Sequence, residues 1–112
     1  MFRREFLPSV GQLMAFESAA RHASVSRAAL EIHLTQSAIS RQIKLLEEQL
    51  GTALFHRVRQ RVVLTDAGRV YAAELRAGLD TLSNATQRVM TMGGIGEVLN
   101  LAVLPTFGTR WL

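Results

Sequence analysis

The chain has 112 residues, 48% of them hydrophobic, which suffices for one small packed domain and part of a second. It contains no cysteine, so disulfide bonds and thiolate metal sites are excluded, and no apolar run approaches the roughly 18 residues of a membrane-spanning helix. Its net charge is +4, and the whole excess lies in residues 1–65, which carry nine Lys and Arg against five Asp and Glu. All these cations except Lys44 are arginine, the residue best suited to phosphate groups and guanine edges.

The chain begins with a short basic segment, MFRREFLPSVGQ. The charged run RRE interrupts it before a signal-peptide core can form, so we expect a cytoplasmic protein. A helix is predicted from Pro8 or Ser9 to about Ala20, and its side chains form a broad apolar arc: Val10, Leu13, Met14, Phe16 and Ala20. Glu17 falls inside this arc, where we expect it at the rim of the core or paired with an arginine.

Ser24 is a good N-cap for a second, short helix with the sequence SRAALEIH. Ala28 and Ala29 in this helix allow another helix to cross closely. His33 and Leu34 leave only a few residues before a third helix begins. Two helices joined this tightly predict a helix-turn-helix, although a bare helical hairpin would have similar spacing.

The third helix is predicted over residues 36–50, from Thr35 as N-cap to Gly51 as C-terminal stop. Its apolar residues fall on one stripe: Ile39, Ile43, Leu46 and Leu50. The opposite face carries an amide, short donors and two cations: Gln36, Ser37, Ser40, Arg41 and Lys44. Glu47 and Glu48 make the later turns negative, so we expect them to face solvent or a neighbouring subunit. A polyanion should therefore meet the first half of the helix, as when a recognition helix enters a DNA major groove.

After the third helix, two short extended runs predict a hairpin over residues 55–64. Arg57, Arg59 and Arg61 alternate within it, so in a strand-like hairpin they would share one side. Like charges this close repel one another unless an anion is near, which favours a basic wing beside the third helix. A solvated turn with incidental charge is the alternative.

A long helix is predicted over residues 66–92, with the capping run Thr-Asp-Ala-Gly at its start. Its apolar positions follow heptad steps, imperfect only at the threonine: Ala72, Leu75, Leu79, Leu82, Thr86 and Val89. About 27 residues at 1.5 Å each give a helix of roughly 40 Å, too long for one small domain to cover. We therefore expect a second subunit to cover it, through the dimer contacts Leu75, Leu79, Leu82 and Val89.

Residues 93–112 no longer follow the heptad pattern of the long helix. Gly93–Gly96 has the composition of a hinge, and Glu97–Leu104 is typical of a buried strand. Pro105, Thr106 and Phe107 then predict a turn or the start of a helix. Since one strand cannot form a sheet alone, we interpret residues 93–112 as a hinge and the truncated start of an α/β domain.

One long run carries most of the specific features: FESAARHASVSRAALEIHLTQSAISRQIKLLEEQLGTALFHR, followed by VVLTDAGRVY. Its segments SRAA, TQSAISRQI, LEEQLG, LF-x-R and LT-x-AG closely resemble the N-terminal domain of the LysR-type transcriptional regulators. The resemblance extends from about Leu7 through the long helix. The tail EVLNLAVLPTFGTRWL resembles the first strand and turn of that family's effector-binding domain, in the branch of glycine-cleavage and β-lactamase regulators.

The resemblance implies a mainly α fold in three parts. These are a winged helix-turn-helix over residues 1–65, a dimerising linker helix over 66–92, and the start of a periplasmic-binding-protein-like sensor over 93–112. Members of the family contact DNA bases in the major groove at the positions of Gln36, Ser37, Ser40 and Arg41.

The resemblance also assigns the wing positions 57–61 to the DNA backbone or the minor groove. Some members have proline in place of Ser37 or Arg61, which affects wing shape and base preference but not the mode of binding. The position of Thr106 often contributes a hydroxyl to the effector, with helix capping as the alternative.

The chemistry of the side chains divides the candidate DNA contacts into two groups. Gln36 can pair with adenine and Arg41 with guanine, each bidentate contact giving roughly 1–3 kcal/mol of discrimination, unless both touch only phosphate. Ser40 suits a base or a phosphate equally. Contacts to the DNA backbone are assigned to Ser26, Arg27, Lys44, Arg57, Arg59 and Arg61. For Ser26, in the first turn of the second helix, a local cap is the alternative.

The sequence therefore predicts a transcriptional regulator that binds promoter double-stranded DNA as a homodimer and is controlled by a small-molecule effector. For the full-length protein, a tetramer is the alternative to the homodimer. The alternative is a sequence-neutral nucleic-acid-binding or architectural protein, but a polar helix face favours base recognition over pure phosphate binding. His22, His33 and His56 lack a metal-binding spacing, and no catalytic set or phosphate loop is present. We thus expect no enzyme activity, no cofactor and no membrane partner.

Overall fold

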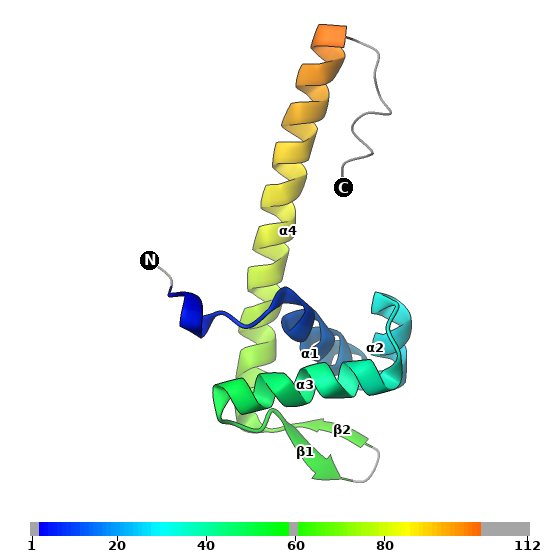
Figure 1. Cartoon of the computed structure of the whole chain (residues 1–112), viewed down its shortest axis with the longest axis vertical. Coiled ribbons are helices and arrows are strands. Elements are labelled where there is room, and N and C mark those ends of the chain that lie inside the picture. The colour runs from blue at the N-terminus through cyan, green and yellow to red at the C-terminus, as the bar shows by residue number, and fades with distance from the viewer. Residues whose placement is uncertain (1–2, 59–60, 102–112) are drawn as a thin grey trace. The chain divides into compact units, whose positions relative to one another are not determined.

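The structure is a computed structural model that describes residues 3–58 and 61–101. After a short 3-10 helix, η1 (Arg4–Phe6), come three helices, two strands and a long helix (Figure 1): α1 (Val10–His22), α2 (Val25–Ile32), α3 (Gln36–Leu50), β1 (Phe55–Val58), β2 (Arg61–Leu64) and α4 (Asp66–Leu101). The chain divides into two compact units, residues 1–76 and 77–112, and α4 contributes to both. The mainly α fold predicted from the sequence is confirmed.

The first three helices begin at the predicted capping residues. The hydroxyl of Ser9 accepts a hydrogen bond from the backbone of Gln12, whose side chain accepts one from Ser9 in return. Ser24 and Thr35 cap α2 and α3 by accepting backbone N–H groups in the same way. Each cap satisfies a helix N–H that has no partner inside the helix, typically worth about 1 kcal/mol.

The turn of the helix-turn-helix depends on a left-handed residue at the end of α2. His33 has a φ of 58°, and Leu34 returns a backbone hydrogen bond to Ala29. α3 ends in the same conformation at Gly51, with a φ of 68°, where glycine carries no Cβ penalty. The predicted stop of the third helix is therefore confirmed.

The core of the first unit is built around α1. Phe16 is fully enclosed, and the centre of its ring lies 5.3 Å from that of Phe55 in β1 and 5.8 Å from that of Tyr71 in α4. The rest of the core comes from the facing sides of the helices and from the loop between α3 and β1: Ala15, Ala19, Ala28, Ala29, Ile39, Ile43, Leu46, Leu54 and Ala72. The small residues at the contact of α1 with α2 allow the close crossing that the sequence predicts.

The two strands form the antiparallel hairpin expected within residues 55–64. Phe55 pairs with Leu64 and Val58 with Arg61. The hairpin is fastened where it meets α4, because the N–H of Thr65 donates to the carbonyl of Leu54 over 3.0 Å. The hydroxyl of Thr65 donates to the carbonyl of Ala53 and accepts the N–H of Gly68, so it both caps α4 and holds the loop before β1.

α4 does not end at residue 92 as predicted, but continues without interruption to Leu101. The expected hinge at Gly93–Gly96 and the first part of the expected strand, up to Leu101, are therefore wrong for this structure; residues 102–104 lie outside the described part. The physical reason is that a strand needs a neighbouring strand for its backbone hydrogen bonds, whereas a helix forms them internally. In the ranges 3–58 and 61–101, β1 and β2 are the only strands, and they pair with each other.

The heptad positions of α4 fall into two environments. Ala72 is buried and Leu75 packs against the core of the first unit, so both serve the fold of their own chain. Leu82 and Val89, farther along the helix, are 57% and 67% exposed. Thr86, between them, donates its hydroxyl to the carbonyl of Leu82.

Gly68 is a position where the fold admits no side chain. A Cβ there would collide with the backbone carbonyl of Leu54 and press on the side chain of Leu64. We expect Gly68→Ala to lower the free energy of unfolding by roughly 1–3 kcal/mol, as overpacked substitutions do. Urea denaturation followed by circular dichroism measures this change.

Gly78→Ala is the matched control, because a Cβ at this position of the same helix meets open space. It should raise helix stability by roughly 0.5–1 kcal/mol. Equal effects of the two substitutions would show that helix propensity, and not the close approach to Leu54, explains the glycine at position 68.

Candidate nucleic-acid interface

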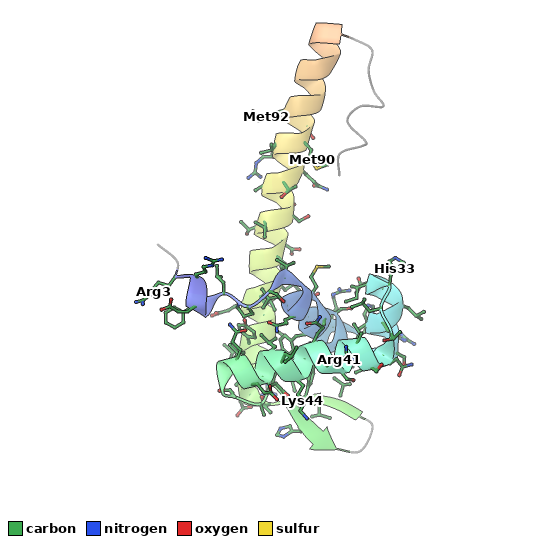
Figure 2. All side chains as sticks on the ribbon, in the orientation of Figure 1. Arg3, His33, Arg41, Lys44, Met90 and Met92 are labelled. Atoms are coloured by element: carbon green, nitrogen blue, oxygen red, sulfur yellow. The ribbon has the colours of Figure 1, made fainter. Side chains whose placement is uncertain are left out.

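α3 has a buried and an exposed face as predicted, and Leu50 is the one apolar residue of the predicted buried stripe that is exposed. Ile39, Ile43 and Leu46 are buried in the core. The opposite face is exposed along its length: Gln36, Ser37, Ser40, Arg41 and Lys44. Figure 2 shows Arg41 and Lys44 following one another along this helix. Leu50, expected on the core stripe, is instead 37% exposed, and the buried residues of the last full turn are Leu46 and Glu47.

A groove of about 640 Å³ brings three elements together at the start of α3. Its lining includes the predicted contact residues of α2 and α3, with one residue of β2: Ser26, Gln36, Ser37, Ser40 and Val62. The cap of α2 is made by Ser24, whose hydroxyl accepts from Arg27, so Ser26 is not needed as a cap. The groove is therefore polar on the helix side, and its hydroxyl and amide groups are accessible.

Three cations near this groove are not neutralised by the protein. Arg27 lies in α2, and Arg41 and Lys44 lie in α3; all three are exposed. Within the part of the chain that the structure describes, none of them forms an ion pair. Their charge is thus available to an external anion.

The predicted contacts of the wing are only partly visible. Arg57 and Arg61 lie in β1 and β2, but their side chains, like the whole of Arg59, fall outside the described residues. The same holds for Thr106, the position implied for the effector. The two strands nevertheless place positions 57 and 61 near the far end of the hairpin from α4.

Glu47 was expected to face solvent or a second subunit, and this expectation is wrong. Its side chain is buried, and one carboxylate oxygen accepts hydrogen bonds from the N–H groups of Leu54, over 2.8 Å, and Phe55, over 3.1 Å. The sequence signal that could have revealed it is its spacing, four residues after Ile43 on the buried side of the helix.

A second cluster of charges lies away from the groove and joins α1, α2 and α4. Glu17, buried in α1, accepts hydrogen bonds from Arg21 over 2.9 Å and from Arg76 of α4 over 3.1 Å. Arg21 also reaches Glu31 of α2, which accepts a further bond from Ser18. Pairing of Glu17 with an arginine was one of the two expectations from the sequence, and it is confirmed.

These contacts shift the acidity of both carboxyl groups in the same direction. The hydrogen bonds of Ser18 and then Arg21 lower the pKa of Glu31 to about 2. The hydrogen bond of Arg21 likewise lowers the pKa of Glu17, although burial of that carboxyl opposes the shift. The clustered carboxylates in turn raise the pKa of Arg21.

The histidines do not gather into a site. His22 is 3.1 Å from the carboxylate of Glu31, whereas His33 and His56 are exposed. Over the described ranges, no group of three or more acidic, histidine or cysteine side chains is placed to hold a metal ion. In those same ranges, no helix has both the length and the apolar character needed to cross a membrane.

The three helices, the hairpin and the long helix together define a winged helix-turn-helix with an extended C-terminal helix. The sequence profile described as "Bacterial regulatory helix-turn-helix protein, lysR family" matches residues 10–69, more than half of the chain. The chain belongs to this family. The resemblance noted from the sequence is thereby confirmed.

Known proteins similar to the chain agree with this assignment. It is 43% identical over 112 residues to the glycine cleavage system transcriptional activator homolog of Haemophilus influenzae, covering 100% of this chain and 36% of that protein. It is 41% identical over 100 residues to a carbapenem-hydrolyzing β-lactamase transcriptional activator of Enterobacter cloacae, covering 89% of this chain and 34% of that protein. The chain therefore spans about a third of the length of these relatives.

A solved structure is also similar to this chain in its fold. The crystal structure of the CbnR_DBD–DNA complex has a TM-score of 0.65 to this chain and 29% sequence identity, and the match covers 73% of this chain and 94% of that one. Unlike the two relatives, it is matched along almost its whole length.

The cluster of Glu17 and Glu31 predicts a loss of stability in acid. Both carboxyl groups have a lower pKa in the folded chain than their ordinary value of 4.5. Their contribution is complete above that value and is lost as the pH falls toward about 2, where Glu31 itself becomes protonated. We expect thermal melting temperatures, followed by circular dichroism, to fall across this interval.

Glu31→Gln should flatten this pH dependence, because it removes the group whose pKa is shifted most clearly. Glu74→Gln, at an exposed glutamate of α4, is the matched control and should leave the dependence unchanged. If Glu31→Gln melts with the same pH dependence as the unsubstituted chain, the cluster is not the source of the acid sensitivity.

Proposed function

We propose that the chain is the DNA-binding part of a transcriptional regulator that recognises a specific promoter sequence as a homodimer. The observation that carries the proposal is the exposed face of α3, which presents Gln36, Ser40 and Arg41 beside the groove toward α2 and the hairpin. A helix presented by a neighbouring helix in this way fits the major groove of DNA, with its N-terminal residues toward the bases.

The polar face of α3 supports base recognition rather than phosphate binding alone. Gln36 and Arg41 can each make two hydrogen bonds to one base, to adenine and guanine respectively. Ser37 and Ser40 lie on the same exposed face and contribute shorter donors that reach a base or a nearby phosphate. A surface for phosphate alone would gain more affinity from additional cations at these positions.

Phosphate contacts would then fix how the domain lies on the duplex. Lys44 extends the exposed face of α3 by one turn beyond Ser40, and Arg27 and Ser26 lie in the first turn of α2. The N–H groups of a helix start and an unpaired cation both favour a phosphate. We assign the same role to Arg57, Arg59 and Arg61 of the wing.

Dimer formation is the second part of the proposal. Leu82 and Val89 leave a row of apolar surface exposed on α4, spaced as in a two-stranded coiled coil. We propose that a second copy of α4 covers this row, with Leu79 and Leu75 extending it toward the first unit. Two DNA-binding domains would then reach two half-sites on one duplex.

The third part of the proposal is regulation by an effector. The relatives are named as transcriptional activators and are about three times as long as this chain. We propose that residues 1–65 bind DNA, that α4 serves dimerisation, and that the segment after α4 begins an effector-binding domain, with a small molecule as effector and Thr106 near it. A regulator of promoter DNA would act in the cytoplasm, and we assign it no catalytic step.

Arg41→Ala and Lys44→Ala should weaken DNA binding in different ways. Loss of Arg41 removes a base contact and should reduce specific binding by roughly 1–3 kcal/mol, relaxing base choice at one position of each half-site. Loss of Lys44 should weaken binding to all duplexes equally and reduce the salt slope by about one unit. Fluorescence anisotropy with the promoter duplex upstream of the chain's own gene, beside a shuffled duplex of equal length, measures both effects.

The unsubstituted chain provides the test of the function itself. Tight binding to the promoter duplex that survives added salt better than binding to the shuffled duplex supports a sequence-specific regulator. Equal binding that collapses together with salt favours a sequence-neutral DNA-binding protein. An unchanged ratio of specific to shuffled binding after Arg41→Ala would contradict the base contact assigned to that residue.

Leu82→Asp should separate the dimer, because it places a charge in the proposed apolar row without touching the core of the first unit. Sedimentation velocity should show a monomer at concentrations where the unsubstituted chain is a dimer. Asn84→Asp adds the same charge two residues later on the exposed helix and should leave the dimer intact. A Leu82→Asp chain that still sediments as a dimer would place the interface elsewhere.

A further inference from the structure

A buried carboxylate ties α3 to the first strand of the hairpin. Glu47 lies in the last full turn of α3 and is only 9% exposed. Its Oε2 accepts the backbone N–H groups of both Leu54 and Phe55, which lie where the chain enters β1. One side chain of α3 therefore holds the beginning of the wing.

The charge of this residue is unfavourable for the function proposed above. Glu47 belongs to the same helix as the proposed DNA-binding face, and burying a carboxylate costs free energy unless hydrogen bonds or ion pairs compensate. Simple electrostatics predicts that a chain without this negative charge would bind DNA more tightly. A benefit from its position has to outweigh both costs.

The surrounding contacts indicate what that benefit is. Between α3 and β1 the chain has three exposed residues, Gly51, Thr52 and Ala53. On its other side the hairpin is fastened to the start of α4, since Thr65 donates to the carbonyl groups of Leu54 and Ala53. Without the carboxylate, the wing would keep its attachment to α4 but lose these two bonds to α3.

We propose that Glu47 is a positioning residue for DNA recognition, which fixes the wing relative to α3 so that both contact the same duplex. This inference rests on the proposed function, because it matters only if the wing and the helix bind DNA together. Its carboxylate touches no DNA and acts through the backbone of Leu54 and Phe55.

The first test compares two neighbouring glutamates. Glu47→Ala and Glu48→Ala remove the same charge from adjacent positions, but the side chain of Glu48 is exposed and forms no hydrogen bond or ion pair with the residues that the structure describes. On the shuffled duplex, Glu48→Ala should bind as tightly as the unsubstituted chain or more tightly. Glu47→Ala should bind roughly tenfold more weakly and lose about one unit of salt slope for each wing phosphate contact that is lost.

The second test asks whether the loss comes from the wing. In the unsubstituted chain, Arg57→Ala and Lys44→Ala should each reduce the salt slope by about one unit. In the Glu47→Ala chain, Arg57→Ala should have little further effect, whereas Lys44→Ala should keep its full effect. General unfolding would weaken both contacts alike, so this pattern distinguishes positioning from stability.

The third test distinguishes the length of the side chain at position 47 from its charge. It does not require that Glu47→Ala folds. The amide oxygen of Glu47→Gln can occupy the place of Oε2 and accept both N–H groups, so this variant should keep the salt slope of the unsubstituted chain. Glu47→Asp keeps the charge but is shorter by one methylene, so it should lose slope as the alanine variant does. Circular dichroism confirms that each variant is folded.

Two results would overturn the proposal while leaving the function intact. One is a folded Glu47→Asp chain with an undiminished salt slope; the other is an Arg57→Ala effect of the same size with and without Glu47. A chain that binds neither duplex before any substitution would instead overturn the proposed function, and this inference with it.

Discussion

The complete enclosure of Phe16 is the constraint on which the arrangement of the first unit depends. Its ring lies against Phe55 of β1 and Tyr71 of α4, while its own helix, α1, packs against α2 and α3. One aromatic side chain thus connects the helical layer, the hairpin and the start of the long helix. Such contacts hold because the interior is closely packed, so none of these elements can move far without opening a cavity beside the ring.

The parts of the fold that the sequence predicted are those decided by local chemistry. Caps at Ser9, Ser24 and Thr35, and the stop at Gly51, follow from the hydrogen bonds and backbone angles of single residues. The apolar stripe of α3 and the two extended runs of the hairpin follow from residue patterns within short stretches of the chain. These signals sufficed to place the exposed polar face of α3, which forms most of the candidate interface.

The incorrect expectations depended on contacts distant in sequence. Nothing near Glu47 in the sequence shows that two backbone N–H groups of the following loop will need its carboxylate. The strand expected after residue 96 assumed neighbouring strands, and in their absence from the described part of the chain residues 97–101 are helical.

The acidic residues explain how a chain with a modest net charge can still present a strongly basic face. Glu17 and Glu31 bind Arg21 and Arg76 away from the groove, and Glu47 is turned inward to backbone N–H groups. These three carboxylates are thus occupied in the fold, while Arg27, Arg41 and Lys44 are left without acidic partners in the part that the structure describes. Which charges are paired internally, rather than how many there are, determines where an anion would bind.

This distribution also bears on specificity. A free cation attracts any phosphate, so affinity alone would not select a sequence. Selection requires that the side chains of α3 meet base edges at the same time as other groups meet the backbone, which is possible only if the distances between the two sets are fixed. In this chain the distances are set by the packing around Phe16 and by the bonds of Glu47 and Thr65 to the loop before β1. The precision of the interface therefore resides in residues that the interface itself does not expose.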